Sequence, residues 1–389
     1  MVVSEGAHCP GCGEVVPPEA RFCEECGAEL TVGAATTAAE PAAVVAGDGV
    51  VARSVAVPDG AVVLAIPSGT CGSCGGSEGY DPDGFCIACG MRSVRPRDRM
   101  EQELSLELEL DLGGPGRMVA VSDKGPRKVR NEDSFALAAL DPLEGDGVGG
   151  GGGLVLSVCD GVSNIPRSDE ASQAACNAAV AVLKGTVQGS IEELQAQAAA
   201  AASAAVVALA PRGAPGAPAG VEPPSCTYLA ARWHPAEGLS VGWLGDCRAY
   251  VVEAGQVSQL TIDHSWGTQA VASGTLTQPD ADRDPRSHAI TRWLGADAQQ
   301  EPIPQLVTHQ ISGPALLVAV SDGAWNYLDH AQQVAEFFAD GDLLGGARRF
   351  TQFAIDRGGH DNITVAAATL APAASPPSDP TGTVPDTIS

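Results

Sequence analysis

The sequence predicts an α+β sandwich for the larger, C-terminal part of the chain, preceded by two small cysteine-containing modules. Three observations lead to this fold class. Short β-rich runs occur on both sides of a central pair of helical segments, without the one-by-one alternation of a repeating βαβ fold. Four Cys-x-x-Cys pairs lie before residue 90. At 389 residues, the chain is long enough for more than one domain and a sizeable core.

The N-terminal cysteines form two modules of similar spacing, at residues 5–30 and 67–95. Two Cys-x-x-Cys pairs are separated by ten residues in the first module and by eleven in the second. Four thiolates at such spacing suit one tetrahedral Zn²⁺, whereas redox Cys-x-x-Cys motifs, the weaker alternative, occur singly. We therefore expect two zinc ribbons with two structural zinc ions, joined by a flexible Ala/Val/Gly/Pro-rich linker at residues 31–66. The expected zinc ligands are Cys9, Cys12, Cys23, Cys26, Cys71, Cys74, Cys86 and Cys89.

Strands of the sandwich are predicted from period-two alternation and from apolar runs. The segment ELSLELELDL, residues 103–112, alternates apolar and acidic residues, which is typical of a strand with one solvated face. Further β-rich runs predict strands at residues 154–158, 226–233, 239–244, 249–252, 315–320 and 363–370.

Two helices are predicted from the residues at their starts. Ser168 precedes the run DEASQAACNAAVAVLK and is expected to cap it. Ser190 and Glu193 match a capping box before an alanine-rich helix. The Pro-rich residues 210–224 predict a loop, and the Pro/Ser/Thr-rich residues 372–389 predict a disordered tail. These limits place the sandwich domain at residues 104–371.

The charge and the N-terminus of the chain restrict its partners and location. The formal net charge is −26, and phosphate backbones are bound through Lys and Arg, so no nucleic-acid partner is expected. The N-terminus lacks the basic and apolar regions of a secretory signal, which predicts a cytoplasmic protein in a reducing compartment. The most apolar stretch, residues 196–210, is alanine-dominated and too short to span a bilayer, so we expect no membrane span.

Acidic residues stand at the ends of the predicted strands. A strand that ends in Asp-Gly places its carboxylate at the sheet edge, and the glycine lets the chain turn away. Alone, each Asp-Gly pair is more often a simple turn. Were the fold to gather them, two carboxylates ~4 Å apart would repel by about 4 kcal/mol at an effective dielectric near 20, and divalent cations would remove that cost. All-oxygen ligands suit Mg²⁺ or Mn²⁺, and two such ions can activate water for attack on a phosphoryl group. The residues are Glu132-Asp133, Asp160-Gly161, Asp322-Gly323 and Asp361-Asn362.

An ordered series of motifs resembles the type 2C (PPM) family of metal-dependent protein serine/threonine phosphatases, in its bacterial form. The motifs are SDKGPRKVRNEDS, VCDGVSN, SCT, VGWLGDCRAY, LTIDHSW, VSDGAWNYL and DNITV, and they cover about residues 104–371. The resemblance implies a four-layer α-β-β-α sandwich. It also implies metal-dependent hydrolysis of phosphoserine and phosphothreonine in proteins that a Ser/Thr kinase has phosphorylated.

The same resemblance implies roles for individual residues. Asp160 would bridge two Mn²⁺ or Mg²⁺ ions, and the Gly161 carbonyl would hold one of them. Asp322 and Asp361 would hold the other ion. Glu132 and Asp133 would be metal ligands or lie next to the ligands. Asp246 would bind a weaker third metal ion.

The phosphate-binding position departs from the family pattern. Lys128 stands where the family usually has Arg, and Lys lacks the bidentate fork of a guanidinium. Arg127 and Arg130 flank it, so the sequence leaves open which of the three holds the phosphate. The DGVSN loop, which begins at Asp160, also has fewer glycines than the DGMGG of bacterial members. In this loop Val162 cannot donate a proton to the leaving serine of the substrate.

Two functions of different classes therefore remain open. The retained aspartates favour an active phosphatase, while Lys128 and the DGVSN loop favour a catalytically weak scaffold that recognises phosphoproteins. A two-metal nuclease would share the chemistry but conflicts with the acidic charge. The cysteine modules show no basic-aromatic face, so we expect them to bind a protein partner or substrate. Four further cysteines are scattered singly, and two of them, Cys159 and Cys247, touch the motifs; we expect these two to be small buried side chains rather than redox sensors.

Overall fold

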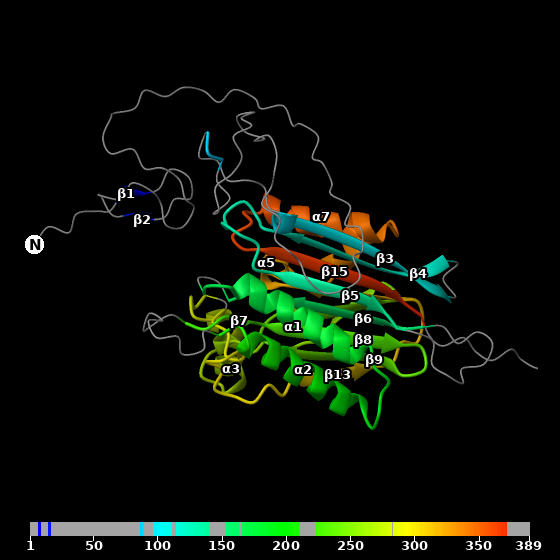
Figure 1. The fold of residues 1–389 in the computed structure, drawn as a ribbon. Coiled ribbons are helices and arrows are strands. Elements are labelled where there is room, and N and C mark those ends of the chain that lie inside the picture. The colour runs from blue at the N-terminus through cyan, green and yellow to red at the C-terminus, as the bar shows by residue number, and fades with distance from the viewer. Residues whose placement is uncertain are drawn as a thin grey trace, which may run out of the picture.

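A computed structural model describes residues 7–8, 15–16, 86–88, 96–110, 114–140, 152–162, 165–210, 222–281 and 283–371. Within these residues the chain forms a four-layer α-β-β-α sandwich, which confirms the predicted fold class (Figure 1). The linker at 31–66, the tail at 372–389 and seven of the eight predicted zinc ligands lie outside the described residues. Cys86 is described, and its side chain is buried. In the first module, β1 (Ala7–His8) pairs antiparallel with β2 (Val15–Val16).

One layer is a six-stranded antiparallel sheet. Its strands, from one edge to the other, are β11 (Gln256–Gln259), β10 (Arg248–Glu253), β14 (Ala315–Val320), β15 (Ile363–Leu370), β4 (Gly114–Asp123) and β3 (Arg99–Leu110). The strands predicted at 315–320 and 363–370 have the same bounds as β14 and β15. In contrast, β3 begins four residues before its predicted start at residue 103. A short 3₁₀ helix, η1 (Pro96–Asp98), precedes β3.

The second layer is a five-stranded antiparallel sheet. Its strands, in order, are β13 (Gln305–His309), β9 (Gly238–Leu244), β8 (Tyr228–His234), β6 (Leu154–Cys159) and β5 (Ser134–Ala139). The single strand predicted at 226–233 is divided between β8 and the short β7 (Ser225–Cys226), which pairs with β12 (Leu294–Gly295).

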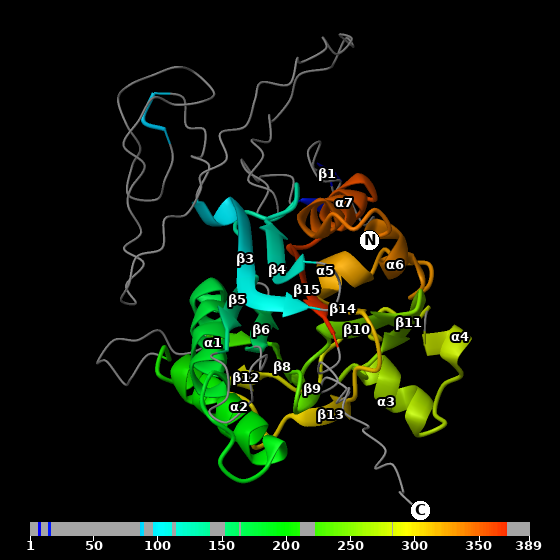
Figure 2. The same ribbon diagram turned by 90° about the vertical axis from the view of Figure 1, so that its right-hand side faces the viewer.

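Helices cover the outer faces of both sheets. The five-stranded sheet carries α1 (Ser168–Leu183) and α2 (Ile191–Val207). The six-stranded sheet carries α5 (Asp322–Trp325), α6 (Gln333–Phe337) and α7 (Leu343–Asp356). The connection from β11 to β12 holds α3 (Trp266–Ala272) and α4 (Gln278–Ala281), which lie at the side of the sandwich (Figure 2). No helix among the described residues is both long and apolar enough to cross a membrane.

The two predicted helix starts had different outcomes. The capping box is confirmed: the Ser190 side chain accepts from the Glu193 N–H, and the Glu193 carboxylate accepts from the Ser190 N–H. The prediction that Ser168 caps α1 was wrong, because Ser168 is the first helical residue and Arg167 stands at the cap. The Ser168 hydroxyl instead donates to Glu132 Oε1 at 2.6 Å and to the Ile165 carbonyl at 2.8 Å.

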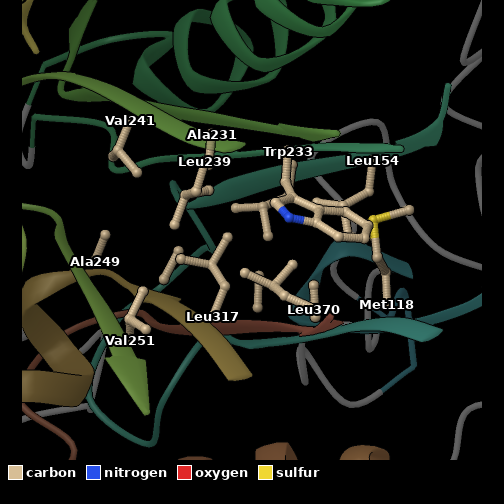
Figure 3. Packing of buried hydrophobic residues seen from close by; sticks show 14 of the residues in the cluster. Met118, Leu154, Ala231, Trp233, Leu239, Val241, Ala249, Val251, Leu317 and Leu370 are labelled. Carbon is tan, nitrogen blue, oxygen red and sulfur yellow. The ribbon is translucent and has the colours of Figure 1, made fainter. Parts of the chain in front are cut away.

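The main core lies between the two sheets (Figure 3). Alternate side chains of each strand face it, as the two-residue period requires. On β6, Leu154, Leu156 and Val158 point into this core, while Val155 packs with α1 and α2. Fully burying a Leu or Val side chain stabilises the fold by about 1.5–3 kcal/mol, so this alternation fixes the register of the strands and the positions of their ends.

Candidate active site

The predicted metal-binding aspartates gather at one end of the sandwich, where strands of both sheets begin or end. In the five-stranded sheet Asp133 precedes β5 and Asp160 follows β6, and the pairing of Ser134 with Cys159 brings the two aspartates side by side. In the other sheet Asp322 follows β14 and Asp361 lies just before β15. Asp246 lies between β9 and β10, where the chain passes from one sheet to the other.

Asp133 is held by hydroxyl groups from the opposite sheet. Its Oδ2 accepts hydrogen bonds from Ser321 Oγ and from Thr364 Oγ1, both at 2.7 Å. Its Oδ1 is buried and has no hydrogen-bond partner. Burial raises the pKa of Asp133 to about 7, although the two hydroxyl donors favour its ionised form. One oxygen is therefore fixed by the protein, and the other is left available to a ligand.

Burial dominates the electrostatics of the neighbouring aspartates as well. It raises the pKa of Asp160 well above its usual range, and the charges of Asp133, Asp322, Asp361 and Asp246 add to this effect. Burial also raises the pKa of Asp322 to about 6, and Asp322 Oδ1 is a second buried oxygen without a partner. The pKa of Asp246 is also raised well above its usual range, because Asp246 is buried and faces the negative charge of Asp322.

Two glycines allow the backbone to approach closely at this site. A Cβ atom on Gly323 would collide with the carbonyl of Asn362, and one on Gly161 would lie 2.7 Å from the Ser168 carbonyl and 2.8 Å from the Glu132 carbonyl. The Asp322-Gly323 pair is not a simple turn, which was the alternative interpretation of such a pair taken alone. It begins the short helix α5, because the glycine lets α5 pack against the start of β15.

The three basic residues of the loop before β5 lie in different environments. Lys128 Nζ is 3.1 Å from Asp361 Oδ1, and its charge is near those of Asp160 and Glu132 as well. Arg127 Nε donates to the Gly358 carbonyl at 3.2 Å. Arg130 Nε donates to Glu132 Oε1 at 3.0 Å. Of these three residues, Lys128 is thus the one whose side-chain cation lies next to the cluster of aspartates.

Glu132 is buried but is directed toward α1. Its Oε1 accepts from Arg130 and from the Ser168 hydroxyl. Its backbone carbonyl accepts the Gly161 N–H at 3.2 Å, which ties the segment before β5 to the loop after β6. The roles predicted for Glu132 and for the Gly161 carbonyl as ligands stay predictions.

Two asparagines position the acidic segment, and sequence reasoning did not assign them a role. Asn362 Oδ1 accepts from the Glu132 N–H at 2.7 Å, and its Nδ2 donates to the carbonyls of Lys124 and Arg130. Asn131 Oδ1 accepts from the Asp133 N–H at 3.2 Å. Both are buried and both stand inside motifs that were singled out, NEDS and DNITV, so their adjacency to the acidic residues was the available signal.

The oxygen donors fit a hard divalent cation. Among the described residues, no three His, Cys, Asp or Glu side chains already converge as a complete metal-binding group. Mg²⁺ usually keeps several waters and takes one or two carboxylates, and Mn²⁺ prefers the same ligand types. The buried, unpartnered oxygens Asp133 Oδ1 and Asp322 Oδ1 are donors of this kind. The residues present therefore fit Mg²⁺ or Mn²⁺ without supplying every ligand.

Comparison with known families agrees with this geometry. Residues 132–346, more than half of the chain, match the family model of protein phosphatase 2C. The chain belongs to the protein phosphatase 2C family. Residues 9–90, which include both cysteine modules, match the family model called double zinc ribbon.

Individual relatives of this phosphatase 2C chain are bacterial. It is 33% identical over 122 residues to the serine/threonine phosphatase stp of Listeria innocua, and 29% identical over 127 residues to the protein phosphatase PhpP of Streptococcus pneumoniae. These matches cover 31% and 33% of this chain and span about half of each relative, 48% and 51%.

Solved structures share the fold. The Streptococcus agalactiae serine/threonine phosphatase has a TM-score of 0.54 at 22% identity, covering 69% of this chain and 99% of that structure. Phosphatase PstP/Ppp of Mycobacterium tuberculosis has a TM-score of 0.52 at 24% identity, covering 66% and 99%.

Proposed function

We propose that this chain is a protein serine/threonine phosphatase that hydrolyses phosphoserine and phosphothreonine esters with the help of Mn²⁺ or Mg²⁺. The observation that supports this most is the group of aspartates from both sheets, in which two buried carboxylate oxygens have no hydrogen-bond partner among the described residues. Buried carboxylates with raised pKa values occur preferentially at functional sites, since repulsion of this kind destabilises the fold. The phosphatases named among its relatives support the same activity.

The residues of the site divide the work of binding and positioning. Asp160, Asp322, Asp361 and Asp133 would hold two divalent cations, with Asp246 reserved for a third. When bound, these ions supply an activated water and offset the charge of the phosphoryl group. Ser321 and Thr364 keep Asp133 in one orientation, because both hydroxyls donate to the same oxygen. Asn362 holds the Lys124–Glu132 loop against the start of β15. The basic residues of this loop are thereby held in place relative to the aspartates of the site.

Lys128 is our choice for the residue that binds the substrate phosphate. It borders the aspartates, whereas the side chains of Arg127 and Arg130 are bound to Gly358 and Glu132. An ammonium binds phosphate as a point charge. We expect Lys128→Ala to raise KM for a phosphopeptide about tenfold, the loss of one charge-assisted hydrogen bond. Arg127→Ala is the matched control and should change KM less; a larger effect of Arg127→Ala would move the role to Arg127.

One observation favours a second function, that of a catalytically weak phosphoprotein-binding scaffold. Lys128 is paired with Asp361, one of the predicted metal ligands, and this pair would compete with both the phosphate and the cation. A scaffold would bind a phosphopeptide in Mn²⁺ without turning it over.

A single assay separates the two functions. Purified full-length chain is incubated with a phosphothreonine peptide in Mn²⁺, in Mg²⁺ and in EDTA, and phosphate release is measured. We expect turnover in at least one metal and none in EDTA. Equal rates in EDTA would exclude the metal mechanism, and binding without release in either metal would support the scaffold.

For the N-terminal modules we propose two structural zinc ions and a role in recruiting a protein partner or substrate. The match to the double zinc ribbon model supports the metal. The modules need reduced thiolates, so we place the protein in the cytoplasm. Elemental analysis after dialysis against a mild chelator should find two zinc ions per chain. Four disulfides after purification under reducing conditions would contradict this assignment.

A further inference from the structure

Arg97 joins the segment after the second cysteine module to the acidic site. It lies in η1, eight residues after Cys89 and directly before β3, the edge strand of the six-stranded sheet. Figure 2 shows β3, which directly follows η1, beside β5. The Arg97 guanidinium crosses to that side: Nη2 donates to the Asp133 carbonyl at 2.9 Å and to Ser134 Oγ at 2.8 Å. Nη1 donates to Gln173 Oε1 on α1 at 3.2 Å.

The backbone of Arg97 reaches Asp133 by a second route. Its carbonyl accepts from Asn131 Nδ2 at 3.0 Å, and the same Nδ2 donates to Ser122 Oγ at 2.8 Å. Ser122 Oγ lies 2.8 Å from Thr364 Oγ1, which donates to Asp133 Oδ2. Asp133 is therefore fixed at its main chain by the Arg97 side chain, and at its carboxylate by a chain of hydrogen bonds that ends at the Arg97 carbonyl.

A surface arginine two residues later shows what an ordinary contact looks like here. Arg99 binds Glu101 and Asp123, its side chain is 42% exposed, and neither acid belongs to the site. Arg97 is half-buried, its Nε is buried, and its side chain donates to three neutral acceptors among the described residues. The charge of Arg97 interacts with those of Asp169, Asp133 and Glu170, so part of its positive potential acts on Asp133.

We propose that Arg97 is a positioning residue for Asp133, which holds this carboxylate in place for the divalent cation. The inference rests on the proposed function of the site. In the sequence, Arg97 is also the first of these site residues after the second cysteine module, eight residues beyond Cys89.

The test compares Arg97→Met, Arg97→Lys and the control Arg99→Met in the full-length chain. Met keeps most of the apolar length of Arg but removes every donor. Isothermal titration with Mn²⁺ alone, without substrate, gives the binding constant, and the Mn²⁺ concentration for half-maximal hydrolysis is measured separately. We expect Arg97→Met to weaken Mn²⁺ binding about tenfold, as for groups that orient metal ligands, with Arg97→Lys between it and the wild type. Arg99→Met should stay within about twofold, as for exposed ion pairs.

Each outcome decides the proposal. A folded Arg97→Met variant that binds Mn²⁺ like the wild type would overturn it. Should that variant fail to fold by circular dichroism, Arg97→Lys decides, because Lys cannot reach all three acceptors and wild-type affinity would again overturn the proposal. A wild-type chain that binds Mn²⁺ but does not hydrolyse phosphopeptides would remove the proposed function alone. A wild-type chain that binds no Mn²⁺ would remove both.

Discussion

Two groups of carboxylates in this molecule show opposite behaviour. In the loop after α4, Asp284 accepts hydrogen bonds from Arg286 Nε, Nη2 and N–H at 3.0, 2.8 and 2.9 Å, and these bonds lower the pKa of Asp284 to about 2. At the end of the sandwich, burial raises the pKa of Asp322 to about 6 and that of Asp133 to about 7. The side chain type is the same; the environment decides.

The difference shows where the fold gives up stability. The hydrogen bonds and the charge of Arg286 stabilise the ionised carboxylate of Asp284, so no further ligand is required. Asp133 and Asp322 each keep one buried oxygen without a partner, in a place where other aspartates repel them. Such an arrangement is costly unless a ligand completes it, and proteins accept that cost mainly at functional sites.

The largest expected effect comes from Asp160→Asn. Asp160 faces four other aspartates and is proposed to bind both divalent cations, so the change would remove a negative charge from the metal site. We expect turnover of a phosphothreonine peptide to fall by at least about 100-fold, together with a weaker Mn²⁺ titration. Asp284→Asn is the control, with the same chemical change in the other environment, and should leave turnover within about twofold. Near-native turnover and Mn²⁺ affinity in Asp160→Asn would show that Asp160 is not the shared ligand.

A second prediction concerns stability and pH. An acid whose pKa is raised in the folded state makes the fold less stable as pH rises, because the unfolded chain releases the proton first. For Asp322 this penalty is absent below about pH 4, grows until about pH 6, and then stays constant. We therefore expect metal-free Asp322→Asn to gain on the order of 3 kcal/mol over the wild type between pH 4 and pH 7.

Chemical denaturation in EDTA at pH 4.5, 5.5 and 7 measures this difference. Saturating Mn²⁺ should reverse the order at pH 7, because an ion that binds only the folded state stabilises the chain that binds it better. Asp284→Asn should show no gain with pH. A constant difference between Asp322→Asn and the wild type at all three pH values would mean that burial does not perturb Asp322 as described.

The sequence predicted the architecture where local pattern and burial agree. The runs at 315–320 and 363–370 became β14 and β15 without change, because every apolar residue of these runs packs on one core or the other. The Ser190 capping box was also predictable, since both of its hydrogen bonds are local. The Ser168 prediction failed because α1 begins at Ser168 itself, whose hydroxyl donates to a distant residue, Glu132.

The candidate site was predictable to the level of its acidic residues, which stand in recognisable motifs. The groups that orient them were not assigned. Ser321 and Thr364 act on Asp133 from the other sheet, more than 180 residues away in sequence, and only the pairing of the sheets brings them there. Arg97 lies before the first predicted strand, in a basic segment whose contact with β5 and α1 depends on tertiary structure.

The smallest effect is expected from removal of the cysteine modules. All the site carboxylates lie after residue 130, so a chain that starts at Met91 keeps them and keeps Arg97. Its turnover of p-nitrophenyl phosphate should stay within about twofold of the full-length value, because removing a separate N-terminal unit leaves the packed domain intact. Turnover of a phosphorylated protein should fall if the modules recruit substrate.

A chain that starts at Met100 has lost Arg97 as well, and we expect it to need more Mn²⁺ for the same rate on the small ester. Circular dichroism checks that both shortened chains are folded. Loss of activity on the small ester in a folded chain starting at Met91 would make the modules part of the active site, and would contradict their role in recruitment.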